Sequence, residues 1–160
     1  MNTDLAGTHV LVTGASGGIG LACARLFAAE GAHLALHYHR RRAPLEPFAA
    51  GASIPNVLVG ANLADEARVD AMYETILAAF PRLDAVVVNH GVWERTPAPL
   101  HEMTLRQWRA TQDADLTSAF LVCRAFLRHL AAVPRPAASI VLVGSTAALF
   151  GEAEHADYSA

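Results

Sequence analysis

Lysine is absent from this 160-residue chain, so all 12 of its basic residues are arginines. Cysteine is scarce. Cys23 and Cys123 both lie in apolar stretches with helical spacing, which favours small buried thiols over a disulfide or a metal pair. The eight histidines include no HExxH-like spacing, so no metal site is expected. A net charge of −3 gives no electrostatic reason to expect a nucleic acid or an anionic membrane as a partner.

Long apolar runs are absent too. No uncharged stretch reaches the length of a membrane span, and residues 1–7 lack the basic and apolar segments of a signal peptide. We therefore expect a cytoplasmic location and no membrane partner. Apolar residues still make up 53% of the chain, and the mean hydropathy is +0.28, which suits a sheet that is buried on both faces.

Short apolar runs alternate with helically spaced apolar residues along the chain. Helices are expected over 19–27, 69–80 and 104–133, whereas the prolines between 44 and 55 allow only a short or broken helix. Strands are predicted at 9–12, 33–38, 56–61, 83–89 and 139–143. This alternation predicts an α/β fold with a doubly wound parallel sheet, in one domain over residues 1–160.

A glycine-rich loop joins the first predicted strand to the first helix. Glycines at such a place permit a tight turn, a close approach of backbone N–H groups to a pyrophosphate, and packing of the helix on the sheet. The predicted nucleotide-binding residues are Thr13, Gly14, Ser16, Gly17, Gly18, Ile19 and Gly20. The alternative is an ordinary glycine-rich turn between a strand and a helix.

The spacing of this loop, TGxxxGxG, resembles the short-chain dehydrogenase/reductase family, and further motifs of that family follow in order. The resemblance implies a Rossmann-type NAD(P)-binding domain that holds five of the family's seven strands and is incomplete at its C-terminal end. It also implies hydride transfer between a nicotinamide and a small carbonyl or alcohol substrate. Because such enzymes usually assemble from identical subunits, the full-length form is expected to be a homo-oligomer.

The end of the second predicted strand favours NADP (NADPH) over NAD. An acidic residue usually binds the ribose 2′-hydroxyl of NAD at this place, whereas here the chain reads His39-Arg40-Arg41-Arg42. Arginines can hold a 2′-phosphate through paired hydrogen bonds, so Arg40 is the first candidate, with His39 and Arg41 beside it. The string HYHR resembles pteridine reductases within the family. The alternative is a solvated basic run on a loop.

Two further positions are implied to contact the nucleotide. Asn62 and Leu63 stand where the family usually has an aspartate that accepts from the adenine amino group; an asparagine still offers a carbonyl acceptor, and a loop-capping role is the alternative. Asn89 and Gly91 match the family's NNAG turn. Between them, His90 is interpreted as a hydrogen-bonded or surface loop residue without a catalytic role.

Asp115 stands where the family has an asparagine that holds a water molecule in the proton relay. A carboxylate there is costly to bury unless it is paired or protonated. Two readings stay open: a functional substitution that still binds the relay water, or drift in a damaged gene.

Ser145 and Tyr158 have the family's separation between its active-site serine and tyrosine. The resemblance implies that the serine hydroxyl stabilises the substrate oxygen while the tyrosine moves a proton. A phenol with a pKa of about 10 is a poor base at neutral pH. The family has a lysine four residues after the tyrosine. A cation about 4 Å from the phenol favours its ionised form by roughly 4 kcal/mol, which lowers its pKa by about three units. That lysine would fall at position 162, beyond the last residue, Ala160.

Two hypotheses about function follow. The first is an NADP(H)-dependent oxidoreductase that is represented here in part. The second is a truncated, inactive nucleotide-binding remnant without the lysine. Under the second hypothesis, ending at Ala160 would leave the fifth predicted strand as an open, apolar edge of the sheet, so we expect the isolated 160-residue chain to aggregate or to be markedly unstable.

Overall fold

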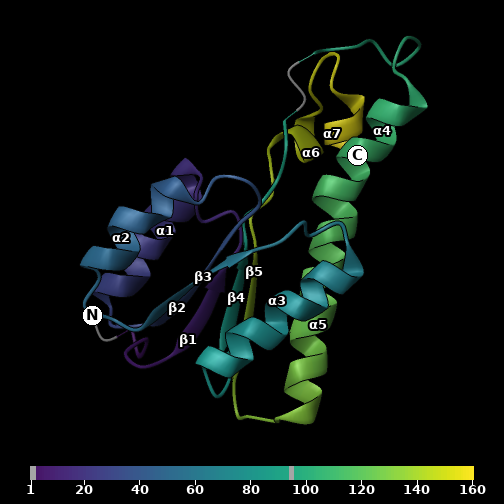
Figure 1. Ribbon diagram of the computed structural model, residues 1–160. Helices are drawn as coiled ribbons and strands as arrows, with labels where there is room; N and C mark the ends of the chain where they lie inside the picture. Colours follow the sequence, from purple (N-terminus) through teal and green to yellow (C-terminus); the bar gives the residue numbers. More distant parts are fainter. Residues whose placement is uncertain (1–2, 94–95) are drawn as a thin grey trace.

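The computed structural model describes residues 3–93 and 96–160 of the chain. Its centre is a parallel five-stranded sheet with the strand order β3-β2-β1-β4-β5 (Figure 1). The strands are β1 (His9–Val12), β2 (His33–Tyr38), β3 (Asn56–Gly60), β4 (Ala85–Val88) and β5 (Ser139–Leu142). The predicted parallel α/β sheet is thus confirmed, and all five strands lie within their predicted ranges.

Helices cover both faces of this sheet (Figure 1). The helical elements are α1 (Gly18–Ala29), η1 (Ala43–Leu45), α2 (Glu46–Gly51), α3 (Glu66–Ala79), α4 (Leu105–Gln112), η2, which is a π-helical turn (Asp113–Thr117), α5 (Ser118–Ala132), α6 (Ala147–Phe150) and α7 (Ala156–Ser159). Alternate residues of β1 join two separate cores: Leu11 packs with residues of α3 and α5, whereas Val10 and Val12 pack with residues of α1. The sheet is therefore doubly wound.

Local signals in the sequence explain where the helices begin and end. The Asp65 side chain accepts a hydrogen bond from the Arg68 N–H and caps α3, and Thr104 caps α4 in the same way through the Gln107 N–H. Past the end of α1, Gly31 has a φ of +79°, which a glycine adopts readily. The prolines between β2 and β3 leave only the short α2, as predicted.

The long helix predicted over 104–133 has the predicted ends but not the predicted regularity. The π-helical turn separates α4 from α5, and Asp115 lies within that turn. Hydrophobic spacing does not reveal one inserted residue in a helix, so this turn could not be predicted from the sequence.

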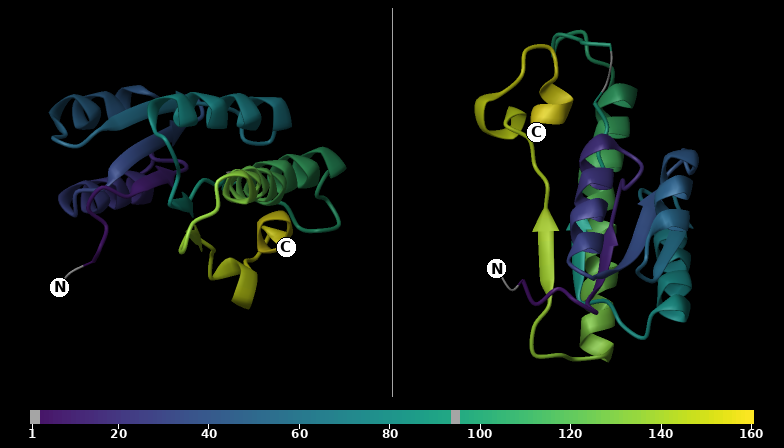
Figure 2. Two further views of the ribbon diagram at one scale, coloured as in Figure 1. Left: turned by 90° about the horizontal axis from the view of Figure 1, so that it is seen from below. Right: turned by 90° about the vertical axis from the view of Figure 1, so that its left-hand side faces the viewer.

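The strand β5 lies at one edge of the sheet, and α6 and α7 lie beyond its end (Figure 2). All four of its residues are exposed, including Leu142 at 65%. This apolar edge agrees with the expected instability of the isolated chain, which stays a prediction. No helix in residues 3–93 and 96–160 is long and apolar enough to cross a membrane.

A buried ionic cluster closes the amino-terminal end of the sheet. The Asp84 carboxylate accepts from the His9 N–H at 2.8 Å and from Arg135, and Arg82 lies beside it. Burial disfavours the charged form, but the hydrogen bonds from His9 and Arg135 outweigh it and lower the pKa of Asp84. The side chain of Arg135 is only 8% exposed, so its charge depends on Asp84 for compensation.

We predict that Asp84→Ala lowers the free energy of unfolding by about 3–5 kcal/mol, because it leaves the buried Arg135 charge without its partner. Denaturant titration measures the loss. Asp70→Ala is the matched control: its carboxylate is half exposed and lies 4.0 Å from Arg128, so a change below about 1 kcal/mol is expected. An equal decrease in the free energy of unfolding of the two variants would show that the Asp84 cluster does not stabilise the fold more than a surface ion pair does.

Candidate functional site

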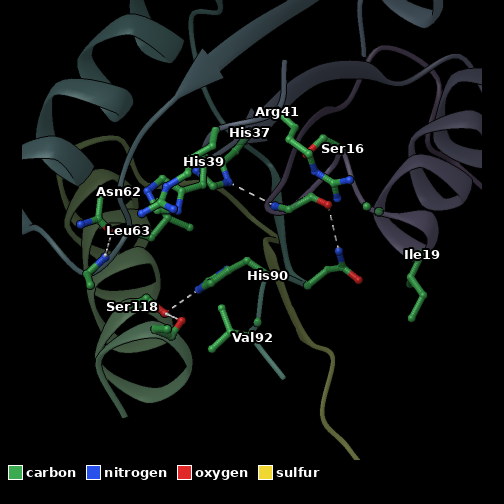
Figure 3. Close-up of a pocket in the computed structure, with 18 of the residues that line it drawn as sticks. Ser16, Ile19, His37, His39, Arg41, Asn62, Leu63, His90, Val92 and Ser118 are labelled. Carbon is green, nitrogen blue, oxygen red and sulfur yellow. Dashed lines mark hydrogen bonds between the residues drawn. The ribbon is translucent and has the colours of Figure 1, made fainter. Parts of the chain in front are cut away.

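A pocket of about 860 Å³ opens at the carboxyl ends of the strands (Figure 3). It lies where β1 and β4 adjoin, with β2 on one side and β5 on the other, which is the point where the winding of the chain reverses. In open parallel sheets, ligands bind in the crevice at such a switch point. The fold therefore places a binding site where the glycine-rich loop begins.

Most of the predicted nucleotide-binding residues come together in this pocket. Those that line it are Gly14, Ser16, Gly17, Gly18, Ile19, Gly20, His39, Arg40, Arg41, Asn62, Leu63, Asn89 and Gly91. Residues that sequence reasoning did not assign to the site also line it, namely His37, Ala64, His90, Val92, Ala110, Asp113, Ala114 and Ser118. Thr13, Asp115, Ser145 and Tyr158 are not among the lining residues.

The glycine loop needs glycine at two positions for steric reasons. Gly14 has a φ of +62°, and a Cβ there would lie 2.9 Å from the His90 Cα. A Cβ on Gly20 would collide with the Gly14 carbonyl oxygen. A Cβ on Gly18, in contrast, would meet no atom of the described residues within 4 Å, and Gly18 borders the hollow of the pocket at the start of α1.

The start of α1 is suited to an anion. Its N-cap is Gly17, which has no side chain to cap the first turn, and that turn holds no acidic residue. The first N–H groups of a helix have no intrahelical acceptor, and the helix dipole makes this end positive. The backbone here can therefore receive a phosphate or a pyrophosphate.

The buried Thr13 joins the ends of β1 and β4. Its N–H donates to the Val87 carbonyl at 2.9 Å, and its carbonyl accepts from the side-chain amide of Asn89 at 3.1 Å. The Thr13 hydroxyl oxygen accepts from the Asn89 N–H at 2.9 Å. Thr13 thus lies beneath the pocket and supports the loop that lines it.

His37 holds the same loop from the side of β2. Its Nδ1 accepts from the Gly14 N–H at 3.1 Å, so its hydrogen is on Nε2, which donates to the Ala61 carbonyl at 3.1 Å. Burial is the main cause that lowers the pKa of His37 to about 4, which keeps the ring neutral at physiological pH. A histidine inside an apolar strand was the available signal, because a buried imidazole must find partners.

His90 is a hydrogen-bonded loop residue, in agreement with the sequence interpretation (Figure 3). The Ser118 hydroxyl donates to the Ala114 carbonyl, so His90 Nε2 carries the hydrogen that is shared with Ser118 over 2.6 Å. His90 Nδ1 then faces the Thr13 hydroxyl at 2.8 Å. Burial, followed by the charge of His37, lowers the pKa of His90 to about 4.

The basic run after β2 divides into two parts. Arg42 forms an ion pair with Glu46, whereas no ion pair of the described residues includes Arg40 or Arg41. Both of these arginines line the pocket and are exposed to solvent. Their positive charges are therefore available to an anion bound at the start of α1.

Asn62 performs the loop-capping role that was one of its two expected roles. Its side-chain oxygen accepts from the Ala64 N–H at 3.2 Å, and the residue also lines the pocket. One lone pair of that oxygen remains for a ligand.

The catalytic candidates are not among the residues that line the nucleotide pocket. The Ser145 hydroxyl oxygen accepts from the Ala147 N–H at 3.2 Å. Tyr158, on α7, contacts Trp93 edge-on with ring centroids 4.8 Å apart. No hydrogen bond joins Ser145 to Tyr158 in the described part of the chain. Asp115 accepts from the Val92 N–H at 2.7 Å, so it too is directed at the loop after β4.

Known proteins match this chain along nearly its whole length. Residues 8–160 match the family described as short chain dehydrogenase. A cis-4-hydroxycyclohexanecarboxylate dehydrogenase of Sinomonas cyclohexanicum is 36% identical over 151 residues, which cover 94% of this chain and 59% of that protein. Glucose 1-dehydrogenase 2 of Bacillus subtilis is 33% identical over 138 residues, with shares of 81% and 51%.

Solved structures agree in fold. A short-chain dehydrogenase/reductase of Brucella melitensis superposes with a TM-score of 0.85 at 30% identity, covering 96% of this chain and 62% of that one. An NADH-dependent reductase solved in complex with NAD superposes with a TM-score of 0.89 at 23% identity, covering 99% and 68%, and shows the shared fold. The chain thus spans between about half and two thirds of the length of these proteins.

We predict that acid weakens the fold through the two neutral histidines. Because their pKa values fall from 6.5 to about 4 on folding, the unfolded chain binds protons first, and stability is lost as the pH falls from about 6.5 to 4. The shift at His37 corresponds to about 3 kcal/mol. Unfolding free energies across this pH range measure the effect.

His37→Asn keeps an acceptor for the Gly14 N–H but removes the titrating ring, so its stability should decline less steeply with acid. The control is His101→Asn, because the His101 side chain is 81% exposed. If the free energy of unfolding falls equally steeply with acid in His37→Asn and in the parent, protonation of His37 does not cause the loss of stability.

Proposed function

Because this chain belongs to the short-chain dehydrogenase family, we propose that it forms the nucleotide-binding part of an NADP(H)-dependent oxidoreductase. The reaction is hydride transfer between a nicotinamide and a small carbonyl or alcohol substrate. The observation that carries the choice of cofactor is the position of Arg40 and Arg41 on the rim of the pocket that begins at the glycine loop.

The residues present fit a dinucleotide. The hollow above Gly18 and the uncapped first turn of α1 suit the pyrophosphate, and Ser16 lies on the same loop. Further along the pocket, the remaining lone pair of Asn62 suits the adenine amino group, with the apolar Leu63 beside it. Thr13 and Gly20 support the shape of the loop, and Ile19, Asn89 and Gly91 also line the pocket.

A 2′-phosphate is the feature that separates NADP(H) from NAD(H). His39, Arg40 and Arg41 line the pocket, and no acidic residue follows β2 directly to accept from a ribose 2′-hydroxyl. Arg42 contributes less because Glu46 already compensates its charge. NAD is therefore the less favoured cofactor.

For the chemical step we propose the family roles for this chain's own residues. The Ser145 hydroxyl stabilises the substrate oxygen, and the Tyr158 hydroxyl delivers or removes its proton. Tyr158 needs a nearby cation to act as a base at neutral pH, and these 160 residues contain no lysine. We therefore propose that this part of the protein is inactive alone and that the complete protein, in the cytoplasm, carries the activity.

We predict that Arg40→Ala weakens binding of NADPH about tenfold or more, because a hydrogen bond to a charged group is worth about 1.5–3 kcal/mol. Binding of NADH should stay unchanged. Fluorescence titration of both cofactors measures this selectivity, and Arg42→Ala is the matched control with a small expected effect. Equal affinities of the parent protein for NADPH and NADH would rule out the proposed cofactor.

We also propose that the full-length protein is a homo-oligomer in which a second copy covers the outer face of α5. Leu116, Phe120 and Leu127 are 64%, 56% and 53% exposed on this helix and the turn before it. Phe120→Glu should therefore shift the protein to a smaller species in size-exclusion chromatography with light scattering. Leu26→Glu, at a 70% exposed leucine of α1, is the control. An unchanged mass for Phe120→Glu would exclude this interface.

A further inference from the structure

Asp115 has one satisfied carboxylate oxygen and one buried oxygen without a partner. Its Oδ1 accepts from the Val92 N–H at 2.7 Å, and a Cβ placed on Gly91 would lie 3.5 Å from the same oxygen. Its Oδ2 is buried and makes no hydrogen bond. A charged carboxylate in this place would keep an unsatisfied anionic oxygen away from water, which is unfavourable.

A second buried carboxylate acts on the first. Asp157 on α7 is 1% exposed, and its Oδ2 accepts from Thr111 at 2.7 Å and from Gln107 at 3.4 Å. Its Oδ1 is buried without a partner. None of the ion pairs among the described residues includes Asp115 or Asp157. Without a cation to compensate it, the charge of Asp157 disfavours the charged form of Asp115.

We propose that Asp115 works as a neutral carboxylic acid, with its proton on Oδ2, and that it positions the loop after β4, which contacts Tyr158 through Trp93. A neutral acid presents one acceptor and one donor, as a carboxamide does, whereas a carboxylate presents acceptors only. In the neutral acid, Oδ1 still accepts the hydrogen bond from the Val92 N–H, and the hydroxyl at Oδ2 can donate one. Asp157 accepts hydrogen bonds from two side chains, whereas Asp115 accepts only from the Val92 N–H.

The position of Val92 matters because Trp93 follows it. The Trp93 ring stacks on His155 at a centroid distance of 3.9 Å and contacts Tyr158 edge-on. By fixing the Val92 N–H, Asp115 fixes the start of the segment that packs against the phenol. Asp115 is therefore a positioning residue that acts on Tyr158 through Val92 and Trp93, and the inference rests on the proposed function only for the role of Tyr158.

The titration of Asp115 agrees in direction with this geometry. Burial raises the pKa of Asp115, and the charge of Asp157 raises it further, against the opposing hydrogen bond from Val92. Of the titratable groups nearby, Asp157 and Tyr158 lie on α7, His155 is the N-cap residue of that helix, and Asp113 shares the π-helical turn. A carboxyl group whose pKa rises on folding stabilises the fold fully at low pH, and this stability is lost as the pH rises through the folded pKa.

The test compares Asp115→Asn with the parent in the protein translated from the complete coding sequence. Asp115→Asn keeps an acceptor and a donor but cannot ionise, so it should be more stable than the parent at neutral pH. The difference should disappear as the pH falls to about 4, near the ordinary pKa of an aspartate. Asp113→Asn, an equal change of charge at an exposed position of the same turn, should produce no such pH-dependent difference.

A spectroscopic measurement decides the protonation state directly. In protein with ¹³C-labelled aspartate carboxyl groups, the signal that Asp115→Asn removes should titrate above the ordinary aspartate range, and Asp157→Asn should lower its midpoint. A midpoint below about 7 would overturn the proposal, because Asp115 would then carry a charge at neutral pH. In the active protein, Asp115→Ala should lower kcat about a hundredfold more than Asp115→Asn does, because only the amide keeps an acceptor for the Val92 N–H.

Failure of this inference and failure of the proposed function can be told apart. The carboxyl titration and the stability comparison need no nucleotide, so they stand if NADPH does not bind. Conversely, selective binding of NADPH with an ionised Asp115 would leave the proposed function intact and would remove only the positioning role.

Discussion

The hydrogen bonds of Thr13 are the interaction on which the site depends. Parallel strands β1 and β4 are neighbours in the sheet but are separated by more than 70 residues of sequence. Thr13 connects their carboxyl ends through its N–H, its carbonyl and its hydroxyl, and His90 extends this network to Ser118 on α5. The glycine loop, the loop after β4 and the long helix are thereby fixed relative to each other at the switch point of the sheet.

Much of this arrangement could be predicted from local signals in the sequence. The limits of β1 and β2 follow from apolar runs bounded by turns, and the glycine loop follows from its spacing between a strand and a helix. The pairing of Arg42 with Glu46, by contrast, depends on the 3₁₀ turn after β2, and a run of three arginines gives no sign of which one is compensated. The basic patch could therefore be predicted from the sequence, but which of its arginines is paired with a carboxylate could not.

The rest of the site depends on contacts between distant segments. The single tautomer of His37 depends on Gly14 on one side and Ala61 on the other, and burial is what lowers the pKa of its ring. Only the packed ends of three strands provide these surroundings. The environment of Asp115 depends likewise on Val92 and on Asp157, 42 residues further along the chain. Sequence reasoning recognised that a buried carboxylate there needs a partner or a proton, but it could not choose, because burial and neighbours are properties of the fold.

The contacts of Gly14 with His37 and His90 affect the thermodynamics of ligand binding. His37 holds the Gly14 N–H, and the His90 backbone lies close against the Gly14 Cα. A loop that is held by neutral imidazoles and a buried hydroxyl has its bound shape before any ligand arrives. Association then loses little conformational entropy in the protein, so more of the free energy of the phosphate contacts remains as affinity. The histidines that border this pocket would thus strengthen binding without contributing a charge of their own.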